Sequence, residues 1–212
     1  MRLQKYMAHC GVGSRRKCEK IIEQGRVCQN GKKVDRMGEM VDPEKDRIAV
    51  DGKRIQMPLE ARVYILLNKS RGTISSVHDQ FNRETVLDQI GWKGARIYPV
   101  GRLDYDTEGL LLLTNDGELT FEMTHPSHQI EKEYFCIVKG NPKPDQLNRL
   151  RTGVDIGGFI TSPAKVKYLG GKQDETRLRI VIREGKNRQV RRMFDAIGCP
   201  VVFLRRERMG HV

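Results

Sequence analysis

The part of the sequence that most restricts the fold is the chain after Val63, where short apolar or alternating runs recur. Six runs have the length and pattern of strands: VYILLNK, ARIYPVG, GLLLLTNDG, YFCIVKG, ETRLRIVIREG and CPVVFLRRERMG. Helical patterns are fewer and cover 118–123, 146–150 and 187–197. Because strands outnumber helices, we expect an α+β domain in which helices flank a mostly antiparallel sheet. The run VYILLNK is apolar enough to predict a buried strand.

The first fifty residues predict a separate, smaller α+β module. Leu3, Tyr6, Met7 and Cys10 have helical spacing, and Ser14 is a suitable N-cap for a second helix that ends near Gly25. Two strand–turn–strand patterns follow, RVCQNGKKV and RIAVDGKRI, with Asn-Gly and Asp-Gly turns. The stretch DGKRIQMPLEA resembles the exit from this module and a short linker. We therefore expect two domains, 1–58 and 59–212.

The composition excludes several classes of protein. No apolar run approaches the roughly eighteen residues of a membrane span, and the start of the chain lacks the apolar segment of a signal peptide. None of the five cysteines lies in a CxxC pair, so we expect reduced thiols and neither a disulfide framework nor a metal site. These features predict a cytoplasmic protein without a membrane partner.

The net charge of +12 is concentrated at the two ends of the chain. Residues 1–33 and residues 177–212 each carry a net charge of +7, whereas residues 34–176 carry −2. A polyanion, most often a nucleic acid, is the partner that such a distribution favours. The alternative is a set of solvated Lys and Arg side chains with no partner.

The N-terminal module closely resembles the alpha-L domain, a small RNA-binding module named after a small-subunit ribosomal protein. The matching elements are RLQKY, GVGSRR and GRV-x-x-NG, and the resemblance covers roughly residues 1–50. It implies that the two-helix face binds structured RNA through Arg2, Lys5, Arg15, Arg16 and Lys17. From the residues alone, a solvated basic face is an equally good reading.

The stretch GRLDYDTEGLLLLTNDGEL, residues 101–119, places acidic residues beside the most apolar run of the chain. Gly101 permits a turn out of one strand and Gly109 a turn into the next, so the residues between them form a loop carried by two strands. Such loops are common places for function. The alternative is a solvated loop in which Arg102 pairs with Asp104 or Asp106.

This stretch resembles the signature of the pseudouridine synthases that modify ribosomal RNA, and most of all their small-subunit/large-subunit branch. LLNKSRG, THPSHQIEKEY and REGKNRQVRRMFDAIG resemble further segments of that family in the same order. The resemblance implies a pseudouridine synthase core, detachment of uracil from C1′ and its reattachment through C5, with no cofactor. It departs at Ser70, where the family usually has proline. It also departs at RRERMGHV, after which relatives usually continue, so we expect weaker packing near Leu204.

The same resemblance implies the roles of the site residues. Asp104 is the nucleophile or base, and Arg191 is the cation that keeps it ionised. The alternative for Arg191 is an exposed pair with Asp195, one helical turn away. Arg188 and Arg192, beside it, are expected to meet RNA phosphates.

The remaining site residues are expected to hold the extruded uridine. Tyr134 stacks on uracil or exchanges a proton, and its alternative is a core strand tyrosine. Arg102 enters the space that the base leaves, and Leu103 and Leu204 wall the pocket. We interpret His125 and His128 as loop residues, because no further ligand completes a metal site.

We therefore expect a monomeric, cytoplasmic enzyme that isomerises uridine in ribosomal RNA, with 23S RNA favoured. The alternatives are a 16S or transfer-RNA substrate, or a non-catalytic ribosome-associated factor that uses only its N-terminal module. The joint presence of Asp104, Tyr134 and Arg191 distinguishes the enzyme from the binding factor.

Overall fold

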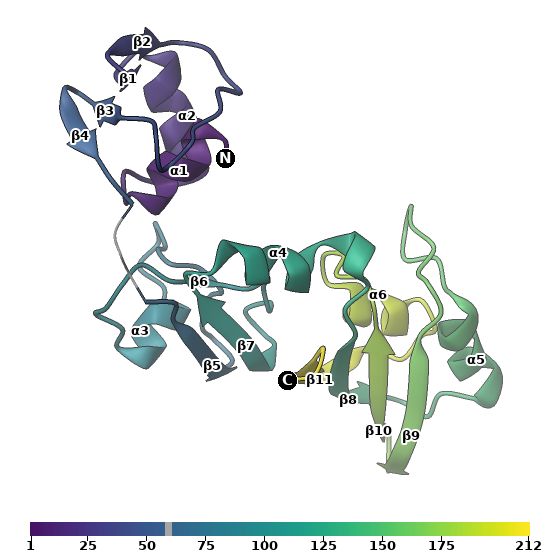
Figure 1. Ribbon diagram of the computed structural model, residues 1–212. Helices are drawn as coiled ribbons and strands as arrows, with labels where there is room; N and C mark the ends of the chain where they lie inside the picture. The colour runs from purple at the N-terminus through teal and green to yellow at the C-terminus, as the bar shows by residue number, and fades with distance from the viewer. Residues whose placement is uncertain (58–60) are drawn as a thin grey trace. The chain divides into compact units, whose positions relative to one another are not determined.

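The computed structural model describes residues 1–57 and 61–212, and the chain divides into two compact units, Met1–Ala61 and Arg62–Val212 (Figure 1). The expected domain boundary between residues 58 and 59 lies outside the described residues, whereas residues 51–57 and 61 of the predicted exit and linker stretch are described. Within 1–57 and 61–212, no helix is long and apolar enough to cross a membrane.

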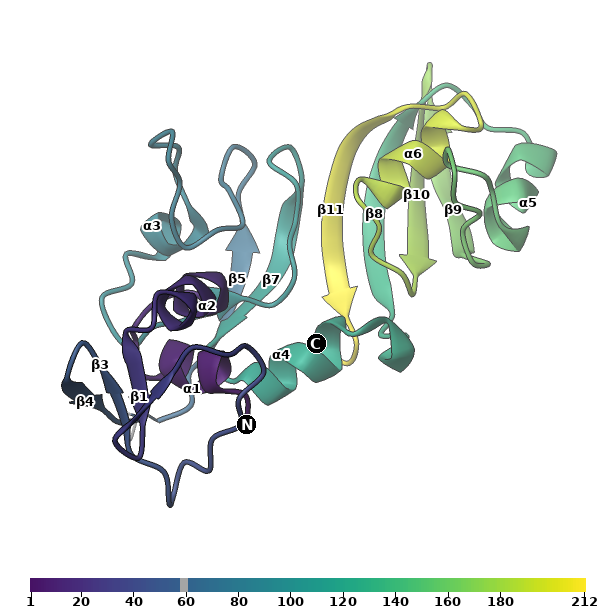
Figure 2. The same cartoon turned by 90° about the horizontal axis from the view of Figure 1, so that it is seen from above.

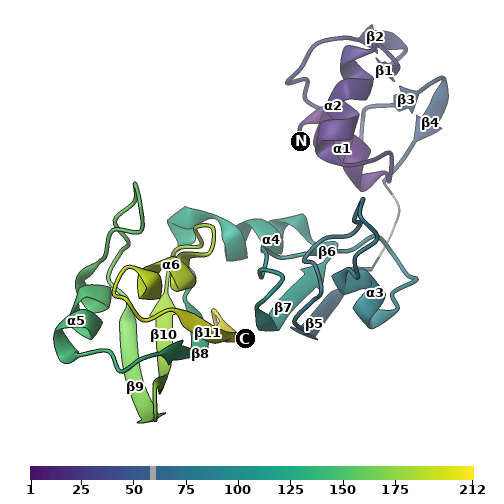
Figure 3. The same ribbon diagram turned by 180° about the vertical axis from the view of Figure 1, so that it is seen from behind.

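The first unit packs two helices against a four-stranded sheet. α1 (Leu3–His9) and α2 (Arg15–Glu23) lie side by side (Figure 3). The strands are β1 (Val27–Gln29), β2 (Lys32–Val34), β3 (Ile48–Val50) and β4 (Lys53–Ile55), in the antiparallel order β2-β1-β3-β4. The apolar stripes of both helices meet Val27, Val34 and Ile48 in one core.

The predicted start and stop signals of this unit are confirmed. The Ser14 side chain accepts a hydrogen bond from the backbone N–H of Lys17, and so satisfies a free donor in the first turn of α2. Gly25, just after the helix, has a φ of +64°, which a residue without Cβ adopts readily. Asn30-Gly31 and Asp51-Gly52 also have positive φ, as two-residue hairpin turns require.

The second unit is built on a mixed seven-stranded sheet. Its main path has the order β5-β7-β11-β8-β10-β9, and β6 pairs with β7 beside this path. Only the contact between β7 and β11 is parallel among the described strands, so the predicted mostly antiparallel sheet is confirmed. The strands are β5 (Tyr64–Lys69), β6 (Tyr98–Pro99), β7 (Glu108–Thr114), β8 (Lys132–Lys139), β9 (Lys165–Lys172), β10 (Glu175–Ile182) and β11 (Val201–Met209).

Two of the helices pack on the same face of this sheet. α5 (Pro144–Thr152) and α6 (Gln189–Asp195) lie beside β8, β9 and β10 (Figure 2). They contribute Leu147, Leu150, Met193 and Phe194 to the core that the inward side chains of β8 and β10 complete. The predicted alternation of β10 is confirmed, because every second side chain is buried. The other helices are α3 (Val86–Ile90), α4 (Gly117–Thr124) and a 3₁₀ turn, η1 (Pro126–His128).

Gly109 has a different role from the one predicted. It lies inside β7, not at a turn before it, with a φ of +106°. A Cβ at this position would lie 2.3 Å from the backbone oxygen of Arg206. The missing side chain therefore lets β11 approach β7 closely enough for the parallel pairing of Arg205 with Glu108 and of Arg206 with Gly109.

Several other expectations are corrected. β5 is an edge strand and not a buried one, since Leu66 is 58% exposed. The packing near Leu204 is not weak, because this side chain is only 4% exposed. β9 was not predicted, since its sequence KVKYLGGK is rich in Lys and Gly, and α3 is too short for a clear helical period.

Candidate active site

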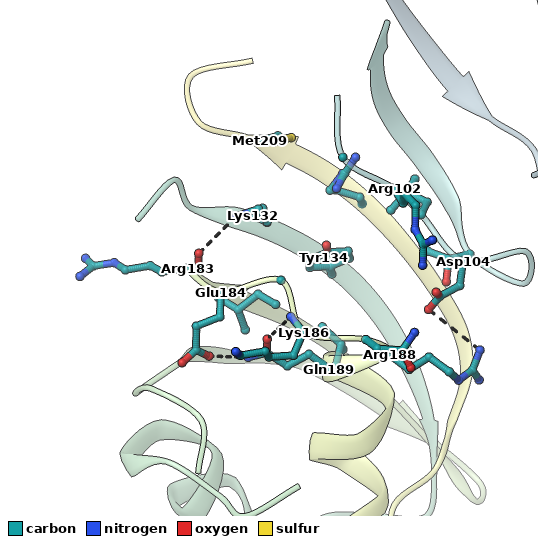
Figure 4. A pocket seen from close by; sticks show the side chains of 18 of the residues that line it. Arg102, Asp104, Lys132, Tyr134, Arg183, Glu184, Lys186, Arg188, Gln189 and Met209 are labelled. Carbon is teal, nitrogen blue, oxygen red and sulfur yellow. Dashed lines mark hydrogen bonds and ion pairs between the residues drawn. The ribbon is translucent and has the colours of Figure 1, made fainter. Parts of the chain in front are cut away.

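A cavity of about 930 Å³ opens beside the loop that carries Asp104 (Figure 4). Its walls come from residues 101–107, the segment after α4, strands β8 and β11, and residues 182–191. Seven Lys or Arg residues line it, against the two acidic residues Asp104 and Glu184. The cavity is therefore a cationic site of a size that accepts a nucleotide.

Two buried polar side chains fix the loop. The Ser75 hydroxyl donates to the carbonyl of Leu103 at 2.9 Å and accepts from the N–H of the same residue at 3.0 Å. The Lys69 ammonium donates to the carbonyls of Ser70, Asp104 and Thr107 at 3.0, 3.1 and 2.8 Å. All three ammonium protons are thus used, and the loop is held from two sides.

Lys69 is fully buried, which is rare for a lysine. Burial lowers its pKa to about 8, although the nearby carboxylates of Asp104, Asp106 and Glu108 act in the opposite direction. The sequence analysis did not single out this residue. A lysine at the inward position of an otherwise apolar strand was the signal that could have revealed it.

The Asp104 carboxylate faces the cavity and is 28% exposed. The cation nearest to it is Arg188, whose Nη1 lies 4.0 Å from Oδ2 (Figure 4). Arg188 is the N-cap residue of α6 and has a left-handed φ of +50°. Its guanidinium group lies next to the Asp104 loop. Arg188 also donates to both carboxylate oxygens of Asp106, at 3.2 and 3.3 Å.

The predicted role of Arg191 as the cation beside Asp104 is therefore corrected in part: the two charges interact, but the ion pair of Arg191 is with Asp106. Arg191 forms an ion pair with Asp106 at 3.2 Å and donates to the Asp106 carbonyl at 2.9 Å. The predicted alternative, an exposed pair with Asp195, is also wrong, since Arg191 is 7% exposed and its Nη1 donates to the Val201 carbonyl. The physical reason is that Arg191 extends from the buried side of α6, and the carboxylate that the loop presents on that side is Asp106.

Asp106 connects the two arginines. Burial opposes its ionisation, but hydrogen bonds from Arg188 and the charge of Arg191 lower the pKa of its carboxyl below the usual value. Asp106 is therefore ionised at neutral pH and holds both guanidinium groups next to the Asp104 loop.

The other predicted pocket residues do line the cavity. Tyr134 and Leu204 form part of its floor from the adjacent strands β8 and β11, and both are buried. Leu103 is buried in the wall, and Arg102 lies exposed at the rim. The alternative for Tyr134 also holds in part, since this residue belongs to the core cluster while it faces the cavity.

The histidines lie in the loop between α4 and β8. His125 accepts from the Ser127 N–H and lines the cavity, and His128 Nδ1 lies 2.8 Å from the Glu122 carbonyl. Both rings contact Phe121. No group of His, Cys, Asp or Glu residues in 1–57 and 61–212 has the arrangement of a metal site.

The basic residues expected to contact RNA fall into two groups. Arg2, Lys5, Arg15, Arg16 and Lys17 lie on or next to the two helices of the first unit, and all but Lys5 are exposed. In the second unit, Arg192 donates to the carbonyls of Ile156 and Gly157, and Arg188 is bound to Asp106. Contacts of Arg188 and Arg192 with RNA phosphates stay a prediction.

Four cationic residues of the cavity were missed by the sequence analysis: Lys132, Arg183, Lys186 and Arg206. Lys132 on β8 and Arg206 on β11 both line the floor near Tyr134. Lys132 lies in the quoted EKEY segment and Arg206 in the last predicted strand. The signal that could have identified Lys132 is its even spacing from Tyr134, which puts both side chains on one face of the strand.

A loop-borne carboxylate on a cationic cavity, in an α+β unit joined to a small basic α+β module, is the arrangement expected of an RNA-modifying enzyme. The RNA pseudouridylate synthase family model matches residues 63–196, and the S4 domain model matches residues 1–48. The chain belongs to the RNA pseudouridylate synthase family and carries an S4 domain. The resemblance found in the sequence is thereby confirmed, together with the enzyme class.

Individual relatives agree with this assignment. The chain is 47% identical over 208 residues to the ribosomal large subunit pseudouridine synthase B of Bacillus subtilis (strain 168), covering 97% of this chain and 84% of that protein. It is 37% identical over 215 residues to the protein of the same name from Vibrio vulnificus (strain CMCP6), covering 100% and 67%. A crystal structure of a pseudouridylate synthase superimposes with a TM-score of 0.68 at 29% identity, covering 100% and 90%.

Proposed function

We propose that this pseudouridine synthase isomerises a uridine in ribosomal RNA, and that its substrate is the RNA of the large subunit, 23S rRNA. The names of two relatives at 47% and 37% identity support a large-subunit target. The observation that carries the chemical part of the proposal is the Asp104 carboxylate, which faces a cationic cavity with Arg188 at 4.0 Å.

In this proposal Asp104 is the reacting carboxylate, as nucleophile or base. It must be ionised to attack carbon or to take a proton. Arg188 supplies the nearest positive charge, and the ion pairs of Asp106 with Arg188 and Arg191 hold that charge in place. Arg191 is thus proposed as a positioning residue, because it acts through Asp106 and the loop backbone.

The uracil ring is proposed to lie on the floor of the cavity. Tyr134 offers an aromatic face to the base and a phenol for proton exchange, and Leu103 and Leu204 bound the ring on its apolar sides. Arg102, at the exposed rim, takes the place of the extruded nucleotide in the RNA. The rearrangement adds no water and changes no oxidation state, so these residues need no cofactor for it.

The S4 domain is proposed to bind structured RNA through Arg2, Lys5, Arg15, Arg16 and Lys17. Three of these cations, Arg15 to Lys17, occupy the first turn of α2, where the helix dipole alone disfavours positive charge. A phosphate bound there would reverse the sign of this interaction. We also propose that the enzyme acts as a monomer in the cytoplasm, where ribosomal RNA is modified.

The experiment is pseudouridine mapping of total RNA from cells with and without the gene, by mass spectrometry or carbodiimide treatment. The expected result is the loss of one pseudouridine from 23S rRNA and its return with the wild-type gene. Loss from 16S rRNA or from transfer RNA would replace the proposed substrate by one of these alternatives. An unchanged set of modifications would favour a non-catalytic ribosome-associated factor.

A further inference from the structure

Arg206 is the buried cation that the proposed mechanism leaves without a task. Its side chain is 3% exposed, and one hydrogen bond is formed, from Nε to the Leu110 carbonyl at 2.8 Å. Its Nη2 is buried and has no hydrogen-bond partner. Among the carboxylates of residues 1–57 and 61–212, none lies within ion-pair distance of Arg206. A buried guanidinium without a counter-ion is strongly unfavourable, unless a ligand supplies the negative charge.

A second cation lies close to Arg206 on the floor of the cavity. Lys132 precedes Tyr134 by two residues on β8, and Arg206 is directly opposite Tyr134 in the β8–β11 pairing. The Lys132 ammonium donates to the carbonyls of Ile130 and Arg183, at 2.9 and 3.2 Å, so one of its three protons is left for another acceptor (Figure 4). Burial, and then the charge of Arg206, lower the pKa of Lys132, which agrees with two neighbouring cations that share no anion.

Lys132 and Arg206 differ in this respect from three other arginines of the cavity, Arg183, Arg188 and Arg191, which have carboxylate partners. Arg188 and Arg191 both form ion pairs with Asp106, and Arg183 pairs with Glu131. We propose that Lys132 and Arg206 form an anion subsite that binds a phosphate of the target nucleotide while its base lies on Tyr134. The inference rests on the proposed function, because it assigns the subsite to the same RNA substrate.

A phosphate fits this pair better than a uracil oxygen does. The full negative charge of a phosphate is attracted by two adjacent positive charges much more strongly than a neutral carbonyl is. Guanidinium groups also bind phosphate oxygens in a paired geometry. The subsite also explains why the uncompensated charge persists in the free enzyme: it is compensated when RNA is bound.

The test is a comparison of RNA affinities on an inactive background, Asp104→Asn, so that chemistry does not alter the probe. The probe is an RNA hairpin that spans the uridine identified by mapping, with either normal phosphates or a neutral methylphosphonate on the 5′ or the 3′ side of that uridine. Arg206→Gln and Lys132→Gln remove the two charges. Arg179→Gln is the matched control, because it removes one charge on the opposite side of β10, where Arg179 pairs with Glu207.

The expected result is a roughly tenfold or greater loss of affinity for Arg206→Gln and for Lys132→Gln, and little loss for Arg179→Gln. A methylphosphonate at one of the two positions should weaken binding by a similar factor in the protein that retains Lys132 and Arg206. The same methylphosphonate should cause no further loss of affinity in Arg206→Gln or in Lys132→Gln. The slope of log affinity against log salt should fall by about 0.7 for each variant, as the loss of one phosphate contact on single-stranded RNA requires. Arg206→Gln should also raise the unfolding temperature of the free protein, since it relieves an unpaired buried charge.

Equal affinities of the variants and the wild type would overturn the proposal. Additive losses from the variants and the neutral linkages would also overturn it, because they would place the contact on the base. A lower unfolding temperature with an unchanged salt slope would indicate a structural role instead. If mapping finds no lost pseudouridine, the proposed function fails first, and this outcome is separate because it precedes any affinity measurement.

Discussion

Replacement of Lys69 by Met tests whether the buried ammonium holds the loop of Asp104. Lys69 forms hydrogen bonds to three backbone carbonyls, of which Asp104 and Thr107 belong to this loop. Met has a similar length and fills the same space, but it leaves these carbonyls without donors. We therefore expect Lys69→Met to lower the catalytic rate by on the order of tenfold to a hundredfold, with a smaller effect on RNA affinity.

The same substitution should also change how the free energy of unfolding depends on pH, and the size of this change follows from the pKa of Lys69. The pKa of Lys69 is lowered from 10.5 to about 8 in the folded protein, so the charged form is disfavoured there relative to the unfolded chain. Between about pH 8 and pH 10.5 the unfolded chain binds one proton more than the folded protein, and stability rises with pH in that window. From pH 7 to pH 10 this difference contributes about 2.5 kcal/mol to the wild type, by the linkage relation, and nothing to Lys69→Met.

The assay is urea unfolding at pH 7 and at pH 10, followed by the fluorescence of Trp92. This is the single tryptophan of the chain, and it packs against the core of the second unit, so the signal reports that unit. All other titrating groups are shared, so the difference between wild type and variant isolates Lys69. The wild type should gain stability relative to Lys69→Met as the pH rises. Parallel pH profiles would refute the argument, and so would a relative loss of wild-type stability.

Three further substitutions test the packing of the site. Ser75→Ala leaves two backbone groups of the Asp104 loop unpaired. We expect it to lower the free energy of urea unfolding by about 1–3 kcal/mol and to lower the catalytic rate. Full activity would contradict the proposed role of the hydroxyl. Gly109→Ala places a Cβ against the backbone of Arg206 at a residue with positive φ. We expect the free energy of unfolding to fall by about 3 kcal/mol or more, or no soluble protein to form. A variant as stable as the wild type would disprove the close approach of β7 and β11. Arg191→Gln leaves the buried side of Asp106 without its cation, and calorimetry should show that the free energy of unfolding falls by about 3 kcal/mol. An unchanged stability would mean that Arg188 alone compensates the charge of Asp106.

The strands with a regular pattern were predictable from the sequence, and those without one were not. β10 alternates over its whole length because one face is buried, and Ser14 and Gly25 mark the ends of α2 because the helix termini need a cap and a left-handed residue. β9 carries Lys and Gly on an edge, where burial imposes no pattern. The exposure of Leu66 depends on which strand forms the edge of the sheet, and local sequence does not determine strand order.

The site was predictable as a set of residues but not as a set of pairs. The resemblance indicated Asp104, Tyr134 and Leu204, and all three line one cavity. The partner of Arg191 depends on the side from which α6 meets the loop, and it proved to be Asp106, while Arg188 lies nearest Asp104. Lys69 and Arg206 act through burial and backbone carbonyls, which only the folded chain brings to them.

The central claim is that Asp104 is the reacting carboxylate of a pseudouridine synthase. Reattachment of uracil through C5 displaces the hydrogen at C5, so RNA labelled with tritium at C5 of uridine releases the label to water when the enzyme acts. The direct measurement compares tritium release by the wild type and by Asp104→Asn, with RNA affinity measured in parallel. We predict release by the wild type and none by Asp104→Asn at equal affinity. Release by Asp104→Asn at a rate near that of the wild type would contradict the account.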